Sequence, residues 1–334
     1  MSEQMVTSGV LDSEAPAQAP SLVAGPITAY LERQDKVVNE AVLDWMMTAF
    51  KKKVLRQLMT TKATRKGHDS NTMYSGPCAV KAWHQYHGSE GEQVKARAVL
   101  KWLLGDTVEL DVVGIAQLAG VQLVDNNRDL FVTSDGDKVQ VHPDGRVVAE
   151  DTWRGWNAGY NCEVKSCDTF TFDSWLAKGG PDDTWGYLTQ ASIEIAAWRE
   201  AGYDVNSTCF VAVSTGSRQG SIAEWIIPYD QSLVDKWHDR RRLARAAERP
   251  LVPFQAEMET EFVKGKVLDV DTAFVFGEPK PRLDKNGKVH GWDVATGRLL
   301  LPTTPCGYCA YKGLCWPGAE LDVDSGKPKW VLKN

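Results

Sequence analysis

The pattern of hydrophobic and polar positions divides the chain into short strands and longer amphipathic helices. Alternating runs predict strands at 130–132, 138–141, 146–148, 162–166, 209–213 and 223–227. Apolar residues at every third or fourth position predict helices at 27–59, 103–112, 183–202 and 232–249. This mixture predicts an α/β fold with a mixed central sheet flanked by helices.

A tight turn is predicted at Pro143-Asp144-Gly145, because these turn-forming residues separate two runs rich in β-branched side chains. We therefore expect a hairpin between 139–141 and 146–148. Such a hairpin would place Asp144 beside the strand at 162–166.

The strand at 162–166 carries an acid and an amine on one face. Successive side chains of a strand point to opposite faces, so Glu163 and Lys165 share one face while Cys162 and Val164 pack on the other. An acid beside an amine is suited to binding a metal and a phosphate. The same alternation is common on solvated strands, so its meaning depends on the neighbouring elements.

Further polar residues flank this strand in a fixed order. Glu109 lies upstream in a segment predicted to be helical, followed by Asp144. Downstream, Tyr187, Gln190 and Glu194 lie at helical spacing on one side of the helix predicted at 183–202.

This order resembles the PD-(D/E)XK nucleases, in particular the RecB-like branch. The resemblance implies a restriction-endonuclease-like core in which Glu109, Asp144, Glu163 and the Val164 carbonyl bind Mg²⁺ or Mn²⁺. It also implies that Lys165 positions or deprotonates the attacking water, and that Gln190 is the glutamine of a Q-x-x-x-Y motif. Two positions depart from the family pattern, since His is frequent where Glu109 lies and Tyr is expected at Glu194.

Four cysteines suggest a second metal site. Cys306, Cys309 and Cys315 form a C-x2-C-x5-C block, and Cys78 lies far upstream. Four-cysteine zinc sites usually draw on two close pairs, whereas here one cysteine precedes three. This order resembles the iron–sulfur RecB-like nucleases, which include the CRISPR-adaptation exonucleases, and so implies a 4Fe–4S cluster. Zinc remains the alternative.

Such a cluster would join two distant parts of the chain. A link from Cys78 to Cys306 closes a long loop and removes unfolded-state entropy, which favours a structural role. A redox-sensing role stays open. The other three cysteines, at 162, 167 and 209, are expected to pack as small hydrophobes.

The net charge of −6 does not exclude nucleic acid, because the positive charge is grouped. One group is Lys51, Lys52, Lys53, Arg56, Lys62, Arg65 and Lys66, and the other lies on the helix at 232–249. Candidate DNA contacts are Arg154, Trp156, Tyr187, Arg241 and Arg245. A solvated or salt-bridged surface is the alternative for each group.

Four regions are expected along the chain. They are a disordered tail at 1–25, a helical region at 26–90, the nuclease core at 91–230, and a carboxyl-terminal region at 231–334 with the basic helix, an inserted hairpin region and three cysteines. No signal peptide or membrane span is visible, so we expect a cytoplasmic protein.

The expected function is a metal-dependent DNA exonuclease that favours single-stranded or free ends and acts in recombination, repair or processing, encoded by a phage, a plasmid or a host. A homo-oligomer and a recombination or helicase partner remain open. The alternatives are a DNA-binding scaffold or helicase-complex subunit with a vestigial site, and a zinc protein.

Overall fold

The computed structural model describes most of the chain between residues 21 and 248 and several shorter segments beyond it. The described ranges are 21–59, 69–76, 78–92, 96–126, 128–148, 158–216, 221–248 and 309–315, together with short strands at 282–283, 289–290, 292–293, 298–299, 319–322 and 329–332.

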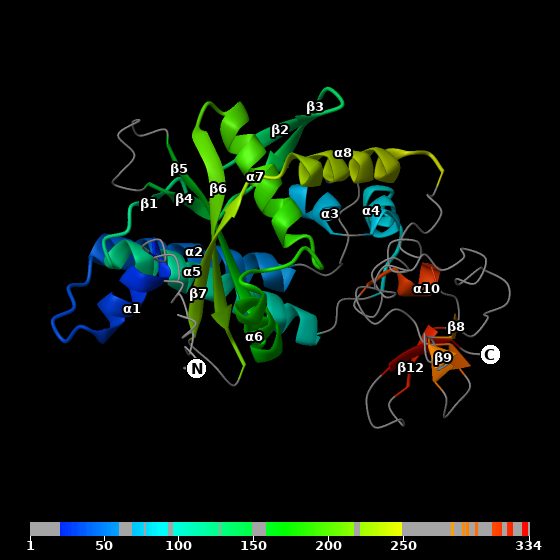
Figure 1. The fold of residues 1–334 in the computed structure, drawn as a ribbon, viewed down its shortest axis with the longest axis horizontal. Helices are drawn as coiled ribbons and strands as arrows, with labels where there is room; N and C mark the ends of the chain where they lie inside the picture. The colour runs from blue at the N-terminus through cyan, green and yellow to red at the C-terminus, as the bar shows by residue number, and fades with distance from the viewer. Residues whose placement is uncertain are drawn as a thin grey trace, which may run out of the picture.

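A five-stranded mixed sheet forms the centre of the fold, with the strand order β1-β4-β5-β6-β7 (Figure 1). The strands are β1 (Leu123–Val124), β4 (Gly145–Val147), β5 (Ala158–Cys167), β6 (Asp204–Ser214) and β7 (Ile222–Pro228). The central pair β5 and β6 is parallel, and the other neighbours are antiparallel. The predicted fold class, a mixed sheet flanked by helices, is confirmed.

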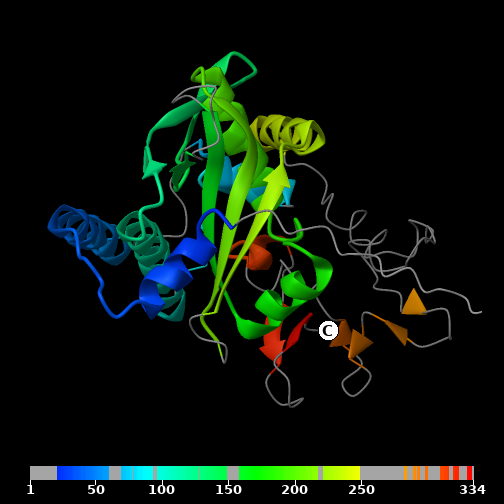
Figure 2. The same cartoon turned by 60° about the vertical axis from the view of Figure 1, so that its left-hand side comes forward.

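Helices cover both faces of this sheet, as the two views in Figures 1 and 2 show. One face is covered by α5 (Ala96–Leu118), which packs on β5 and against α1 (Ala24–Glu32) and α2 (Glu40–Met59). The crossover from β5 to β6 places α6 (Thr169–Lys178) and α7 (Tyr187–Glu200) on the other. There α8 (Gln231–Arg245) packs on α7, α3 (Asn71–Ser75) and α4 (Ala79–Tyr86).

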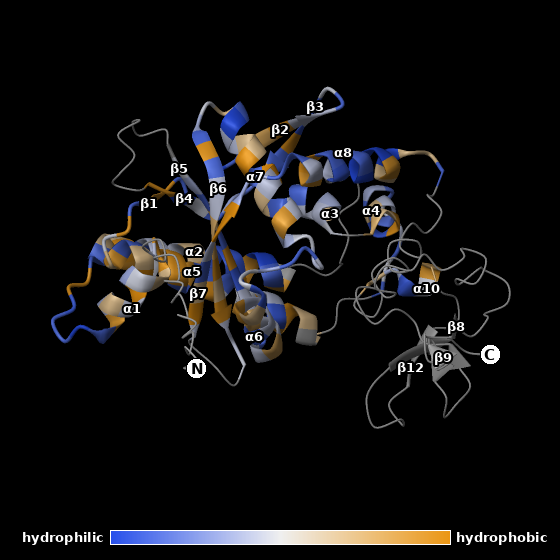
Figure 3. Cartoon of the chain, in the orientation of Figure 1, coloured by the Kyte–Doolittle hydropathy of each residue, from blue (hydrophilic) through white to orange (hydrophobic). Residues whose placement is uncertain are grey.

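The two faces of β5 have the division that its sequence predicted. Cys162 and Val164 belong to the apolar cluster formed with α5. Glu163 is fully buried on the opposite face, the one that α7 covers. Figure 3 shows the accompanying hydropathy pattern, with hydrophobic residues along the central strands and a largely hydrophilic α8.

The hairpin predicted around Pro143-Asp144-Gly145 is wrong. Instead, β3 (Asp137–Val141) pairs with β2 (Leu130–Ser134), and β4 pairs with β1 and β5. The tight turn lies at the other Asp-Gly pair, where Asp135 and Gly136 have φ values of 50° and 81°. Two consecutive positive φ angles are typical of a type I′ hairpin turn. The residues around Asp144 instead carry the chain from the β2–β3 hairpin to the central sheet.

Two helix boundaries also differ from those expected. The segment predicted as one helix from 27 to 59 is two helices, α1 and α2. The helical region expected at 26–90 is further divided between α3, which ends at Ser75, and α4, which is capped by Cys78, whose sulfur accepts a hydrogen bond from the Lys81 amide.

Residues 21–25, which were expected to belong to a disordered tail, are held against the sheet. The Glu224 carboxylate on β7 accepts hydrogen bonds from the Leu22, Val23 and Ala24 amides, each at 2.8 Å. The side chain of Val23 is fully buried.

The carboxyl-terminal part contains short antiparallel pairs and the small helix α10 (Lys312–Cys315). Strands β8 (Arg282–Leu283) and β9 (Val289–His290) pair as the hairpin predicted at 284–288 requires, although the turn lies outside the described residues. The remaining pairs are β10 (Trp292–Asp293) with β11 (Arg298–Leu299), and β12 (Ala319–Asp322) with β13 (Lys329–Leu332).

None of the helices in the described ranges has the length and apolar character needed to cross a bilayer.

The two ends of α7 provide a matched test of backbone packing. Gly186 and Gly202 have φ values of 81° and 88°, but only at Gly186 would a Cβ atom collide, 2.0 Å from the Ser75 carbonyl oxygen. We expect Gly202→Ala to lower the free energy of unfolding by about 1 kcal/mol through φ strain alone. Gly186→Ala should cost roughly 2–5 kcal/mol, because overpacking is added to the same strain.

Urea denaturation of the two variants measures this difference. Equal losses of stability would show that α7 can shift away from α3, and would contradict the packing described for this helix end.

Candidate active site

Asp144 lies at the start of β4, next to the strand that carries Glu163. Gly145 pairs with Cys162, and Asp144 Oδ2 accepts a hydrogen bond of 2.8 Å from the Val164 amide. This bond holds the Asp144 carboxylate beside Val164, the residue of β5 between Glu163 and Lys165. The predicted neighbourhood of Asp144 is therefore confirmed, although the predicted hairpin is not.

Glu163 and Lys165 form an ion pair on the face of β5 that is covered by α7. The Glu163 side chain is fully buried, whereas the Lys165 side chain keeps 21% exposure. The Glu163 carboxyl also lies in hydrogen-bonding contact with Glu194, and Lys165 is the cation that pairs with it among the described residues.

Glu194 lies next to Glu163 and is held by two side-chain amides. Its Oε1 accepts a hydrogen bond from Gln190 and its Oε2 accepts one from Asn161, each at 2.9 Å. The Asn161 oxygen in turn accepts a bond of 3.0 Å from the Trp198 indole. Each Glu194 oxygen thus has a fixed side-chain amide donor.

The electrostatic balance of this region is negative. Burial, followed by repulsion from Glu109 and Glu163, raises the pKa of Asp144 well above its usual value. Burial and the neighbouring Glu194 do the same to the pKa of Glu163. Burial and Asp144 raise the pKa of Glu194 to about 7.

Lys165 is the cation within this group of acids. Burial alone would lower the pKa of Lys165, but Glu163 and Asp144 outweigh it and raise that pKa above the usual value. The ammonium is thus retained at neutral pH. One lysine thus stands against three acidic side chains and offsets their negative charge only in part.

Glu109 lies near these residues but has its own partner. It projects from α5 and pairs with Lys53 of α2 at 2.5 Å, and Lys53 Nζ also lies 3.8 Å from Asp106. Its charge contributes to the raised pKa of Asp144. As the side chains lie, no three His, Cys, Asp or Glu residues within the described ranges surround a common point closely enough to hold a metal ion.

Tyr187 closes one side of the site. Lys165 Nζ lies 5.5 Å from the centre of its ring, and Trp175 packs edge-on against the ring with centroids 5.9 Å apart. The residue is half-buried, so only part of its ring could meet a substrate. Asn161 and Lys53, which also shape the site, were not predicted as site residues.

Three of the four candidate cluster cysteines lie against α4. Cys78 caps the helix, and its pKa is raised by burial and also by Cys309. Cys315 Sγ lies 3.9 Å from His84 Nε2. Cys306 lies outside the described residues.

The segment at 309–315 is fixed to α4 and the residues that follow it. Tyr311 stacks on His84 with ring centroids 5.1 Å apart. The Glu92 amide donates to the Ala310 carbonyl at 2.7 Å, and the Glu92 carboxylate pairs with Lys312. Regions more than two hundred residues apart are thereby brought together, as a cluster linking them would require. His84 is a buried packing residue.

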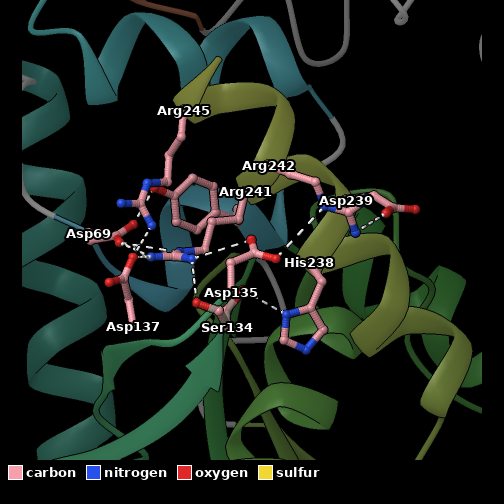
Figure 4. Close-up of polar contacts among 10 residues, drawn as sticks. Asp69, Ser134, Asp135, Asp137, His238, Asp239, Arg241, Arg242 and Arg245 are labelled. Atoms are coloured by element: carbon pink, nitrogen blue, oxygen red, sulfur yellow. Dashed lines mark hydrogen bonds and ion pairs between the residues drawn. The ribbon is translucent and has the colours of Figure 1, made fainter. Parts of the chain in front are cut away.

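Arg241 has a structural role rather than the predicted contact with DNA (Figure 4). Its side chain is fully buried, and Nη2 lies 2.7 Å from Asp69 and 3.0 Å from Asp137. Nη1 donates to the Ser134 carbonyl at 2.8 Å. The guanidinium thus joins α8 to the β2–β3 hairpin and leaves no free face for phosphate.

The remaining candidate DNA contacts have different surroundings. Arg245 also pairs with Asp137 and keeps 32% exposure. Arg154 and Trp156 lie outside the described residues. In the first basic group Lys51 and Lys52 are exposed, whereas the side chains of Lys53 and Arg56 pair with acids of α5.

Comparison with known proteins gives only distant structural matches. No family model and no curated protein match the chain. Among solved structures, that of SSO0001 has a TM-score of 0.37 and 13% identity, and the match covers 61% of this chain and 88% of that one.

Two further matches are to an alkaline exonuclease from Laribacter hongkongensis, LHK-Exo. Its structure has a TM-score of 0.37 and 15% identity, covering 53% of this chain and 86% of that one. Its complex with dAMP has a TM-score of 0.37 and 14% identity, covering 58% and 90%. At these scores we base no argument on the matches.

The raised carboxyl pKa values predict how the stability of the metal-free protein depends on pH. Glu194 binds its proton more tightly in the folded state, with a pKa of about 7 against an ordinary value of 4.5. The unfolded chain loses this proton first, so the free energy of unfolding should fall as pH rises from roughly 4.5 to 7. Chemical denaturation with chelator at several pH values measures the slope.

Glu194→Gln should flatten this slope, whereas Glu248→Gln, at an exposed position beyond α8, should leave it unchanged. A slope that Glu194→Gln does not alter would contradict the placement of Glu194 in the acid group.

Proposed function

We propose that this protein is a metal-dependent DNA exonuclease that carries a structural 4Fe–4S cluster. The observation that supports the proposal best is the group Asp144, Glu163 and Glu194, in which three carboxyls with raised pKa values face one lysine. A divalent cation would relieve this excess of negative charge.

The carboxylates suit a hard divalent cation such as Mg²⁺ or Mn²⁺. Asp144 and Glu163 would be the principal ligands, with the Val164 carbonyl as an additional oxygen. Glu109 would complete the set by exchanging its ion pair with Lys53 for the cation. When bound, the cation lowers the pKa of a water molecule and stabilises negative charge on the phosphate.

Lys165 acts as a fixed positive charge in this proposal. Because the neighbouring acids raise its pKa, the amine remains protonated and does not accept the proton of the attacking water. Its ammonium instead donates hydrogen bonds that orient the water and offset the charge that develops on the phosphate. Of the two roles inferred from the sequence, positioning is thus favoured over deprotonation.

Gln190 acts inside the protein rather than on the substrate. Its side-chain amide donates a hydrogen bond to Glu194, and this bond holds the Glu194 carboxylate in place. Tyr187 limits the space above Lys165 and offers a partly exposed ring beside the site. The choice of DNA, of free ends and of single strands rests on the resemblance to the RecB-like nucleases.

The placement of the cysteines supports the proposed cluster. Cys78, Cys309 and Cys315 are distant in sequence but all lie against α4, and Cys306 would be the fourth ligand. Thiolates are the ligands that iron–sulfur clusters require. A cluster here would secure the carboxyl-terminal segment to the helical region, which is a structural role.

The catalytic claim is tested by cleavage of end-labelled single- and double-stranded DNA by anaerobically purified protein with Mg²⁺ or Mn²⁺. We expect metal-dependent loss of label, and a loss of activity of at least about a hundredfold in Asp144→Ala and in Lys165→Ala. Lys178→Ala, at an exposed position on α6 outside both basic groups, is the matched control and should retain activity.

Intact DNA from folded, metal-supplied protein would contradict the nuclease and favour a DNA-binding scaffold. The position of the label that is released first would give the polarity of digestion.

The cluster claim is tested by the colour and metal content of the protein. We expect brown protein with about four iron atoms per chain after anaerobic purification. Cys309→Ser should lose iron and stability, whereas Cys167→Ser, which lies on β5 outside the cysteine group, should keep both. Colourless protein with bound zinc would instead identify the zinc alternative.

A further inference from the structure

We infer that Glu194 is a positioning residue that acts through Glu163 to strengthen the binding of the divalent cation. The inference rests on the proposed function and concerns the position where the family motif has Tyr. In this role Glu194 orients the metal ligand Glu163 and adds a second negative charge that attracts the cation.

The hydrogen bonds of Glu194 hold it in one orientation. The residue is fully buried, and its two oxygens each accept one side-chain amide at 2.9 Å, from Gln190 and from Asn161. Each oxygen thus has a fixed donor, which holds the Glu194 carboxylate in one orientation beside Glu163, with which it also makes hydrogen-bonding contact.

Strand β5 carries both Glu163 and Asn161, the residue that binds Glu194. Asn161, Glu163 and Lys165 are two residues apart and share one face of the strand. Asn161 is itself held by Trp198, and its amide also donates to Thr208 at 3.2 Å. The register of β5 thus fixes the distance between Glu194, which Asn161 binds, and the carboxylate of Glu163.

The charge of Glu194 is costly unless a cation is bound. Two adjacent buried carboxylates repel each other, and neutral amide donors do not cancel the second charge. An uncharged side chain of similar size would fill the same space without this penalty. The arrangement becomes favourable when a divalent cation lies against Glu163, because both charges then attract it.

We expect the loss of Glu194 to weaken the binding of the divalent cation. Removing a group that orients a metal ligand typically weakens metal binding by roughly 10- to 100-fold. Because Glu194 acts through Glu163, its effect should disappear once Glu163 can no longer coordinate. This dependence distinguishes positioning from a general contribution to packing.

The experiment is a double-mutant cycle on Mn²⁺ affinity, measured by calorimetric titration and by the paramagnetic resonance signal of free Mn²⁺. The four full-length proteins are the wild type, Glu194→Gln, Glu163→Gln and the double variant. We expect Glu194→Gln to weaken binding roughly 10- to 100-fold in the wild-type background and less than about twofold in the Glu163→Gln background.

Circular dichroism and thermal unfolding establish that each variant is folded. If Glu194→Gln fails to fold, Glu194→Met provides the same cycle with an uncharged side chain of similar length.

The outcomes separate the inference from the function on which it rests. Equal effects of Glu194→Gln in the two backgrounds, or an unchanged affinity in both, would overturn the positioning role while leaving the nuclease intact. Wild-type protein that binds no Mn²⁺ would overturn the metal-dependent function itself, and the inference with it.

Discussion

The burial of Glu163 on the central strand is the constraint on which the rest of the site depends. A carboxylate in the middle of a sheet needs compensating groups on the same face, and β5 supplies them two residues away on either side. Asn161 binds the neighbouring acid Glu194, and Lys165 pairs with Glu163 itself. The parallel pairing of β5 with β6 requires a crossover, and its helix α7 supplies Gln190 and Glu194. One strand register therefore assembles most of the acid group.

The sequence predicted which side chains share a face of a strand more accurately than it predicted which strands pair. Side-chain alternation correctly placed Glu163 opposite Cys162 and Val164, because this property belongs to a single strand. The pairing of β3 was predicted wrongly, since the chain contains two Asp-Gly pairs and both are suited to a hairpin turn. Only the one at 135–136 has the two positive φ angles that the turn needs. Asp144 nevertheless lies where expected, because β4 and β5 are neighbours.

In the basic helix α8, the spacing of the apolar residues could have corrected the prediction that Arg241 contacts DNA. Val234, Trp237, Arg241 and Ala244 recur at helical spacing and are all buried. That stripe marks Arg241 as facing inward, whereas its charge alone suggested contact with phosphate. Its partners Asp69 and Asp137 are distant in sequence, so their identity required the tertiary structure. The same is true of Lys53, which meets Glu109 only because α2 packs on α5.

The contact between Glu224 and residues 22–24 lies on the outermost strand of the sheet. Among the described residues, strand β7 lies at the end of the strand order, so one of its sides has no neighbouring strand there. The start of α1 is tied to this strand through three backbone amides. The amino-terminal segment thus joins the strand at this end of the sheet to α5, because α1 contacts both.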